Sequence, residues 1–474
     1  MKDKTVQGVA WSSIDTFATL GLQFVVGILL ARLLSPSEYG VIGLVTVFLA
    51  ISDVFIQSGF SSALIRKNDC TESDRSTVFI FSVVVSVIFY FFWFLSAPFI
   101  ARFYDMPILT SVTRVIALTI IAGAICIVPN AIFSSRIDFK TTAKISVSSS
   151  VLGGIVGITM AYMGYGVWAL VFQSITLQVY RSVMTLIMSK WLPRERFSKQ
   201  SFKDLFSFGS KLMLSNLLNT IYNNLYTIVI AKFFSARTLG LYSRAQGYAN
   251  LPSYYLTNVL QRVTFPVFST IQEDQERLSG AYRQLLKMSA YITFPLMMLL
   301  CGLSDPFIRW LITDKWEDCI ILLQLLCFSM MWYPIHAINL NLLQVKGRSD
   351  LFLRLEIIKK IIGVVVLFVS AYWGIIGLCV GGIISSIFSL VINTHYTGKL
   401  IAVGFWKQTL DLLPIFIVSV VGGGLSFAVT LLPIDYYFIT LVIGTLVFTV
   451  FYFIASRLWL ADEYKETLQL LKRK

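Results

Sequence analysis

Charged residues are scarce in this chain. Asp, Glu, Lys and Arg make up only 14% of its 474 residues, whereas hydrophobic residues make up 56% and the mean hydropathy is +0.75. Soluble domains carry about 25% charged residues, so this composition excludes an ordinary soluble protein. Strict alternation of polar and apolar residues is also missing from runs such as Val78–Phe94, which excludes a transmembrane β-barrel.

Histidine and cysteine are rare as well. His336 and His395 are the only histidines, and the six cysteines form no CxxC pair, so no ligand spacing indicates a metal site. The predicted outer loops are too short to carry paired catalytic acids. This argues against an enzyme such as a membrane polymerase or acyltransferase. We expect no catalytic residue, no metal and no bound cofactor.

Long apolar stretches dominate what remains. About 14 of them reach the roughly 20 residues that a helix needs to cross a bilayer. We therefore predict an all-α polytopic membrane protein. The predicted spans begin near Trp11, Tyr39, Thr77, Thr110, Lys144, Gly166, Phe208, Leu239, Arg283, Glu317, Leu351, Gly374, Gln408 and Tyr436.

Basic residues set the predicted topology. With the N-terminus in the cytoplasm, Lys and Arg lie on the cytoplasmic side about five times as often as on the outer side, a strong positive-inside signal. Both termini are then cytoplasmic. The net charge of +14 is explained by these loops, which can also contact anionic membrane lipids, and requires no nucleic acid.

The chain resembles itself at an offset near 200. The segment Ala31–Gly40 returns as Ala231–Gly240, and Pro98-Phe99-Ile100 returns as Pro306-Phe307-Ile308. Six spans in each half imply two parallel lobes, and such halves are typical of transporters. The predicted organisation is an N-terminal lobe (1–190), a cytoplasmic linker (191–207), a C-terminal lobe (208–400), and two additional transmembrane helices with a cytoplasmic tail (401–474).

Polar residues inside the predicted spans are the best guide to function, because in lipid they tend to face a neighbouring helix or a hydrated cavity. In the first and second spans they share one helical face, and about 200 residues later the seventh and eighth spans repeat the pattern. These stripes comprise Asp15, Thr19, Gln23, Thr46, Asp53, Gln57, Asn216, Asn219, Asn223, Gln246, Asn250, Tyr254, Asn258 and Gln261. We expect a central substrate cavity, although interhelical hydrogen bonding would also explain the stripes.

Three arginines lie within predicted spans. Arg181 is deep, whereas Arg114 and Arg244 lie near span ends, where snorkelling to head groups is an alternative. All three are candidates for binding an anionic head group, because guanidinium offers forked donors to phosphate. Asp15 and Asp53 are candidates for binding a coupling H⁺ or Na⁺. Glu356 and Lys359-Lys360 are expected to pair at helical spacing, as a structural ion pair near the cytoplasm.

The opening VAWSSID from Val9 to Asp15, followed by ARLLSPSEYGVIGLVTVFLAISDVFIQSGFSSALI from Ala31 to Ile65, resembles the polysaccharide transporter family of the MOP flippase superfamily. The likeness is greatest to the colanic acid exporter and O-antigen flippase branch involved in lipopolysaccharide biosynthesis. It is most specific over residues 8–105, and LSPSEYG at 34–40 matches a loop of the family. The family has no sharply defined motif of site residues to carry over.

The resemblance implies a flippase that moves polyprenyl-pyrophosphate-linked oligosaccharide across the bacterial inner membrane by alternating access. Two six-span lobes would enclose the head group while the lipid tail stays in the bilayer. Implied partners are the lipid-linked oligosaccharide and the polymerase and glycosyltransferases of the same pathway. A lipid-linked peptidoglycan precursor flippase and a drug or cation antiporter of the same superfamily remain alternatives.

Overall fold

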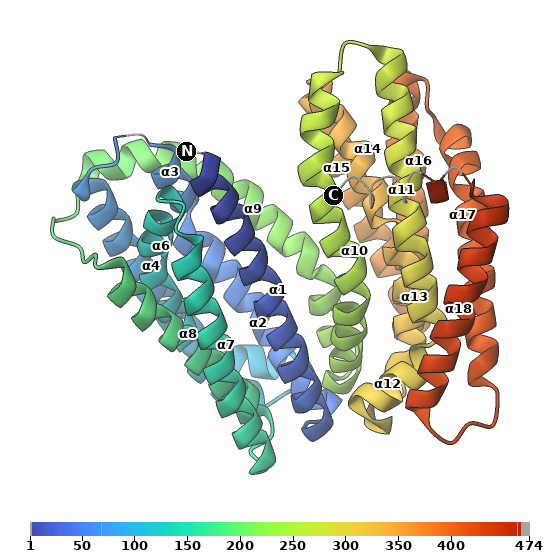
Figure 1. The fold of residues 1–474 in the computed structure, drawn as a ribbon. Coiled ribbons are helices and arrows are strands. Elements are labelled where there is room, and N and C mark those ends of the chain that lie inside the picture. The colour runs from blue at the N-terminus through green and yellow to red at the C-terminus, as the bar shows by residue number, and fades with distance from the viewer. Residues whose placement is uncertain (1, 68, 462, 466–474) are drawn as a thin grey trace. The chain divides into compact units, whose positions relative to one another are not determined.

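The protein is a bundle of long helices (Figure 1), as seen in a computed structural model. The structure describes residues 2–67, 69–461 and 463–465, and within these ranges it contains no strand. The side chains of several further residues, Asn258 among them, lie outside the description. The prediction of an all-α membrane protein is confirmed.

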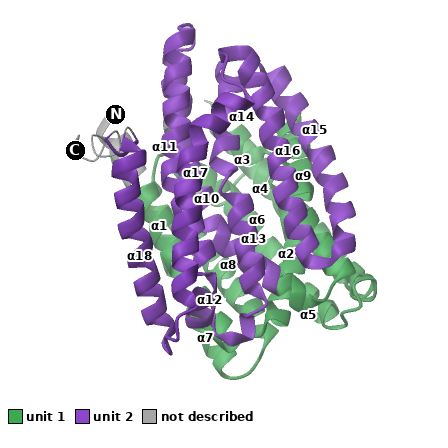
Figure 2. Ribbon diagram, turned by 90° about the vertical axis from the view of Figure 1, so that its right-hand side faces the viewer, with its two compact units in different colours: residues 1–240 green, residues 241–474 purple. Residues whose placement is uncertain are grey.

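The helices divide between two compact units, residues 1–240 and 241–474, which Figure 2 colours separately. The helices of the first unit are α1 (Lys2–Leu33), α2 (Pro36–Gln57), α3 (Phe60–Arg66), α4 (Glu72–Phe103), α5 (Ile108–Ile116), α6 (Leu118–Ser135), α7 (Phe139–Tyr162), α8 (Val167–Ser189) and α9 (Lys199–Phe233).

The second unit begins inside α10 (Ala236–Thr270). It continues with α11 (Gln275–Gly302), α12 (Ser304–Ile312), the 3₁₀ turn η1 (Asp314–Trp316), α13 (Cys319–Met330), α14 (Tyr333–Val345), α15 (Ser349–Ser370), the 3₁₀ turn η2 (Ala371–Trp373), α16 (Gly374–Ile401), α17 (Phe405–Thr430) and α18 (Tyr437–Trp459). The ion pair expected in α15 is confirmed, with Lys359 Nζ 2.6 Å from Glu356 Oε1.

Eleven segments among the described residues are long and apolar enough to span a membrane. One of them, Ser349–Ile401, contains both α15 and α16. The helices α9 and α10 have 35 residues each but are not among the eleven. The protein is therefore a multi-pass membrane protein, and a total of 14 crossings stays a prediction.

The connector between α8 and α9 is held on the first unit. Trp191 donates its indole N–H to the Glu72 carboxylate at 2.8 Å, and the backbone N–H of Ser198 donates to Thr77 Oγ1 at 3.0 Å. The residues after this connector form the start of α9, where Phe202 stacks on Phe206 with ring centroids 5.0 Å apart. The boundary between the units thus follows α9, whereas the predicted domain limits at 190 and 208 stay a prediction.

The internal repeat is visible in local structure. Ser35 precedes α2, and the Glu38 carboxylate accepts hydrogen bonds from its backbone N–H and hydroxyl at 2.6 and 2.9 Å. Ser235 precedes α10 and accepts a hydrogen bond from the backbone N–H of Thr238 at 3.1 Å. Because Ser is a favoured residue at this position, matching turns begin the second helix of each repeat.

Candidate functional site

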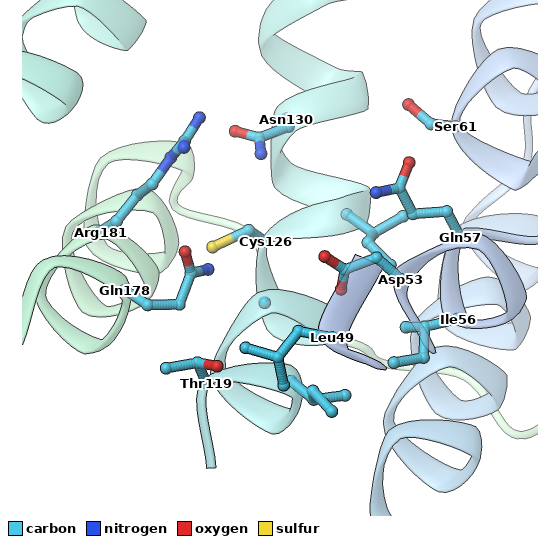
Figure 3. A pocket seen from close by; sticks show the side chains of 13 residues that line it. Leu49, Asp53, Ile56, Gln57, Ser61, Thr119, Cys126, Asn130, Gln178 and Arg181 are labelled. Atoms are coloured by element: carbon cyan, nitrogen blue, oxygen red, sulfur yellow. The ribbon is translucent and has the colours of Figure 1, made fainter. Parts of the chain in front are cut away.

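A polar cavity lies inside the first unit, between α2, α3, α6 and α8 (Figure 3). Its volume is about 330 Å³, within the range of small-molecule sites. It is lined by Leu49, Asp53, Ile56, Gln57, Ser61, Thr119, Ile120, Gly123, Cys126, Ile127, Asn130, Gln178 and Arg181.

Two opposite charges line this cavity. Asp53 projects from α2 and Arg181 from α8, and they are the only charged side chains among the described lining residues. Within the described part of the chain, neither has a hydrogen-bonding or ionic partner. A charged group in a membrane-spanning segment usually pairs with another group or faces water. Both charges are therefore available to a ligand.

The rotation of α2 is set by hydrogen bonds to α4. Trp93 donates its indole N–H to Ser52 Oγ at 2.6 Å, and Ser82 donates its hydroxyl to the Ile56 carbonyl at 3.1 Å. Ser52, Ser82 and Ile56 are buried at this contact. With this face of α2 turned toward α4, the neighbouring positions Asp53 and Gln57 are turned toward the cavity.

The rotation of α8 is set in a similar way by α6. Ser182 is buried and donates its hydroxyl to the Ala122 carbonyl at 2.6 Å, and Cys126 Sγ lies 3.2 Å from Ser182 Oγ. This contact orients the adjacent Arg181 and, one turn earlier, Gln178 toward the cavity. Each charged residue of the site is thus the direct sequence neighbour of a serine that is buried in a helix–helix contact: Ser52 precedes Asp53, and Ser182 follows Arg181.

An elbow between α2 and α3 brings Ser61 to the same cavity. Ser58 and Gly59 both adopt left-handed backbone conformations, with φ of 43° and 70°, so α2 ends and α3 continues in a new direction. Glycine is favoured at position 59 because it adopts the left-handed conformation without strain. It also allows close packing against α9, because a Cβ at position 59 would lie 2.7 Å from the Gly209 carbonyl oxygen. The helix α9 therefore packs directly against the α2–α3 elbow beside the cavity.

The remaining predicted residues of the first unit do not line this cavity. On α1, Asp15 Oδ1 accepts a hydrogen bond from Thr19 Oγ1 at 3.2 Å, and Gln23 is exposed. On α2, the Thr46 hydroxyl donates to the Gly43 carbonyl at 2.7 Å. On α9, the side chains of Asn216, Asn219 and Asn223 are all exposed.

The predicted stripe on α10 belongs to the second unit. Gln246, Asn250 and Gln261 are half-buried there, and the exposed ring of Tyr254 lies 6.1 Å from the ring of Tyr333. The side chain of Asn258 lies outside the described residues. A cavity shared by stripes of the two halves stays a prediction.

The three candidate arginines lie in different surroundings. Only Arg181 lines the cavity. Arg114 Nε donates to the Phe94 carbonyl at 3.2 Å, and its guanidinium lies 4.4 Å from the centroid of the Phe94 ring. Arg244 is half-buried in α10 of the second unit. The structure therefore separates Arg181 from the other two candidates.

Sequence reasoning missed the part of the cavity that comes from α6 and α8. Thr119 and Asn130 are polar residues in the largely apolar α6, and Gln178 lies one helical turn before Arg181 on α8, which was the available signal. Together with Gln57 and Ser61, they supply amide and hydroxyl groups that both donate and accept hydrogen bonds.

Comparison with protein families gives a match over most of the chain. The model of a family described as "Polysaccharide biosynthesis protein" matches residues 29–321. These residues include every residue that lines the cavity. The resemblance seen in the sequence is thus confirmed at the level of the family.

Three curated relatives are also proteins of polysaccharide biosynthesis, by their names. The teichuronic acid biosynthesis protein TuaB of Bacillus subtilis is 27% identical, over 73% of this chain and 72% of its own. The lipopolysaccharide biosynthesis protein WzxC of Escherichia coli is 24% identical, over 83% and 80%. The succinoglycan biosynthesis transport protein ExoT of Rhizobium meliloti is 27% identical, over 69% and 66%.

Two solved structures share the fold. The lipid II flippase MurJ in an inward closed conformation matches 95% of this chain and 99% of its own, with a TM-score of 0.75 and 15% identity. An inward-facing multidrug resistance MATE transporter of the MOP superfamily matches 83% and 98%, with a TM-score of 0.59 and 18% identity. With its family model matched over residues 29–321, this all-α multi-pass membrane protein belongs to the polysaccharide biosynthesis protein family.

Proposed function

We propose that this protein is a flippase for oligosaccharide repeat units that are linked to polyprenyl pyrophosphate. It moves them across the bacterial cytoplasmic membrane for surface polysaccharide biosynthesis. The observation that carries the proposal is the guanidinium of Arg181, which has no partner among the described residues and lines a polar cavity within a membrane-spanning bundle. The names of the relatives, which include a transport protein for succinoglycan, support the substrate class.

The proposed mechanism is alternating access by two lobes. The hydrophilic head group enters from the cytoplasm, the polyprenyl tail remains in lipid, and rearrangement of the lobes exposes the head group outside. Both termini are cytoplasmic in this proposal, as the distribution of basic residues predicts. The protein acts together with the glycosyltransferases that build the repeat unit and the polymerase that consumes it, and carries out no bond-making step itself.

A coupling ion completes the proposed cycle. Asp53 lines the cavity and has no partner in the described part of the chain, whereas Asp15 accepts a hydrogen bond from Thr19, so Asp53 is the better candidate for binding H⁺ or Na⁺. An ion bound at Asp53 would remove the one negative charge of the cavity. The presence of Arg181 in the same cavity opposes binding of an organic cation, which disfavours the drug antiporter alternative.

Deletion of the gene in the source organism tests the proposal. We expect loss of surface polysaccharide and accumulation of lipid-linked repeat units, measured by mass spectrometry of extracted lipids, with recovery of export on re-expression. Unchanged surface polysaccharide and lipid intermediates would overturn the proposal. Accumulation of lipid-linked peptidoglycan precursor with cell lysis would instead favour the peptidoglycan alternative, which shares the fold.

A further inference from the structure

We infer that the cavity of the first unit binds a sugar residue bearing a single carboxylate, such as a uronic acid, rather than the pyrophosphate of the lipid carrier. The inference rests on the proposed function and specifies which part of the repeat unit this cavity takes. It follows from the charge of the site, the geometry of its cation and the nature of its other lining residues.

The charge of the cavity is the first argument. Its one cation, Arg181, is matched by one anion, Asp53, so the empty cavity is formally neutral. A pyrophosphate diester carries a negative charge on each phosphorus and would leave two uncompensated charges inside a membrane-spanning bundle. Such charges are costly where water is limited. A monoanionic sugar leaves only one uncompensated negative charge, and the positive coupling ion proposed at Asp53 neutralises that charge.

The geometry of the cation is the second argument. A guanidinium donates two parallel hydrogen bonds to one carboxylate or to one phosphate group, so a single arginine holds a single anionic group. Arg181 is free to make such a contact, since no described residue accepts a hydrogen bond from its side chain. No second Lys or Arg lines the cavity, among the residues described, to bind the other phosphate of a pyrophosphate.

The other lining residues suit a sugar ring. Asn130 and Gln178 flank Arg181 in Figure 3, while Gln57 and Ser61 lie on the opposite wall, so hydroxyl groups on both sides of a ring can be hydrogen-bonded. The carboxylate of Asp53 accepts hydrogen bonds from hydroxyl groups as well. Leu49, Ile56, Ile120 and Ile127 provide apolar surface for the C–H face of the ring.

Binding to the purified full-length protein in lipid nanodiscs tests the inference. The probes are D-glucuronate, D-glucose and inorganic pyrophosphate, followed by saturation-transfer NMR and titration. We expect glucuronate to bind at least about tenfold more tightly than glucose, because only glucuronate gains the charge-assisted contact with Arg181. Pyrophosphate should bind more weakly than glucuronate.

Variants assign the preference to the cavity. Arg181→Gln should abolish the preference for glucuronate, and Arg181→Lys, which keeps the charge but loses the fork, should retain only part of it. Asp53→Asn should tighten glucuronate binding, because it removes the opposing negative charge. Arg114→Gln is the matched control: Arg114 contacts Phe94 and lies outside the cavity, so the preference should survive.

Three results would overturn the inference: equal binding of glucose and glucuronate, no detectable glucuronate binding, or Arg181-dependent binding of pyrophosphate that is tighter than that of glucuronate. Each is independent of the deletion experiment. A deletion strain that accumulates repeat units, combined with protein that does not select glucuronate, would reject this inference and leave the proposed function standing. A strain with normal export would reject the function whatever the probes bind.

Discussion

Each unit of the protein combines an arginine with an aspartate, and the two combinations differ in their partners. In the second unit, Arg283 donates two hydrogen bonds to Asp411, with Nε and Nη2 at 2.7 and 2.6 Å from the carboxylate oxygens. In the first unit, Arg181 and Asp53 line the same cavity and neither has a partner among the described residues. The same residue types therefore join α11 to α17 in one unit and remain available to a ligand in the other.

The two units also differ in how some of their neutral polar side chains are paired. In the second unit, the amide of Gln408 donates to Tyr282 Oη at 3.0 Å and to Thr397 Oγ1 at 2.9 Å, and accepts a hydrogen bond from Asn339 at 3.2 Å. All four side chains are buried. In the first unit, Gln178, Asn130 and Gln57 face an open cavity. The Gln408 network of the second unit thus stabilises the fold, whereas these three side chains of the first unit can bind a ligand.

The largest expected effect is on the stability of the second unit. Gln408→Ala leaves buried groups of Tyr282, Thr397 and Asn339 short of a partner, and we expect a loss of about 2–4 kcal/mol in the free energy of unfolding. Thermal unfolding of the purified protein in detergent measures it. The matched control is Gln178→Ala in the cavity, expected to cost less than about 1 kcal/mol. Equal losses would remove the contrast between the units.

The next effect is on transport. Arg181→Gln removes a charge-assisted contact worth about 1.5–3 kcal/mol, so we expect export to fall about 10- to 100-fold while the unfolding temperature stays unchanged. Surface polysaccharide in a complemented deletion strain, normalised to protein level, measures it. Arg283→Gln should behave in the opposite way, lowering the unfolding temperature because Asp411 loses its partner. If both variants changed export and unfolding temperature in the same way, the proposed difference between Arg181 and Arg283 would be wrong.

A smaller effect is expected at the elbow beside the cavity. A Cβ at residue 209 would collide with the Ser58 carbonyl, so Gly209→Ala should displace the α2–α3 elbow and destabilise the protein by about 1–2 kcal/mol. Export should fall more than stability alone explains, because Gln57 and Ser61 flank the elbow. Gly280→Ala in α11 is the control: no atom lies within 4 Å of its added Cβ, and the change should stabilise that helix by about 0.5–1 kcal/mol.

The smallest expected effect is a pH dependence at Lys67, between α3 and α4. Lys67 Nζ lies 2.7 Å from the buried Asp74 carboxylate, and this hydrogen bond raises the pKa of Lys67 above its ordinary value of 10.5. Because the pKa of Lys67 is higher in the folded than in the unfolded protein, its ion pair stabilises the fold fully at pH values below the unfolded-state pKa. This stabilisation is lost as the pH rises through the folded-state pKa of Lys67.

We would measure the unfolding temperature from pH 8 to about two pH units above the ordinary lysine pKa. As the pH rises, the unfolding temperature of Lys67→Gln should fall less steeply than that of the natural protein, because the variant has no such stabilisation to lose. Lys144→Gln, on an exposed site of α7, should leave the slope unchanged. A wild-type slope in Lys67→Gln would show that the ion pair adds no stability.

Much of the fold could be predicted from the sequence because membrane spans are local features. The expected starts near Tyr39, Gly166 and Gly374 lie within three residues of the starts of α2, α8 and α16. The pair Glu356–Lys359 was also predictable, since residues three apart on a helix are neighbours whatever the helix packs against. Local spacing is sufficient for predictions of this kind.

The cavity was only partly predictable. Asp53, Gln57 and Arg181 were candidates from the sequence, yet nothing in their spacing indicated that α2 and α8 face one cavity. Asn130 and Gln178 were missed because their contribution depends on the rotation of α6 and α8. That rotation is set by contacts between distant residues, such as Ser182 with the Ala122 carbonyl.

By itself, the sequence determined that this is a helical membrane protein with a repeated plan and five candidate charges in its predicted spans, because hydrophobic length and residue type are properties of single segments. Only the tertiary structure decided that Asp53 and Arg181 share a cavity while Arg283 and Asp411 pair with each other. The reason is physical: whether a charge is paired depends on which helix faces it, and that is set by packing between residues more than 100 positions apart, as for Arg283 and Asp411.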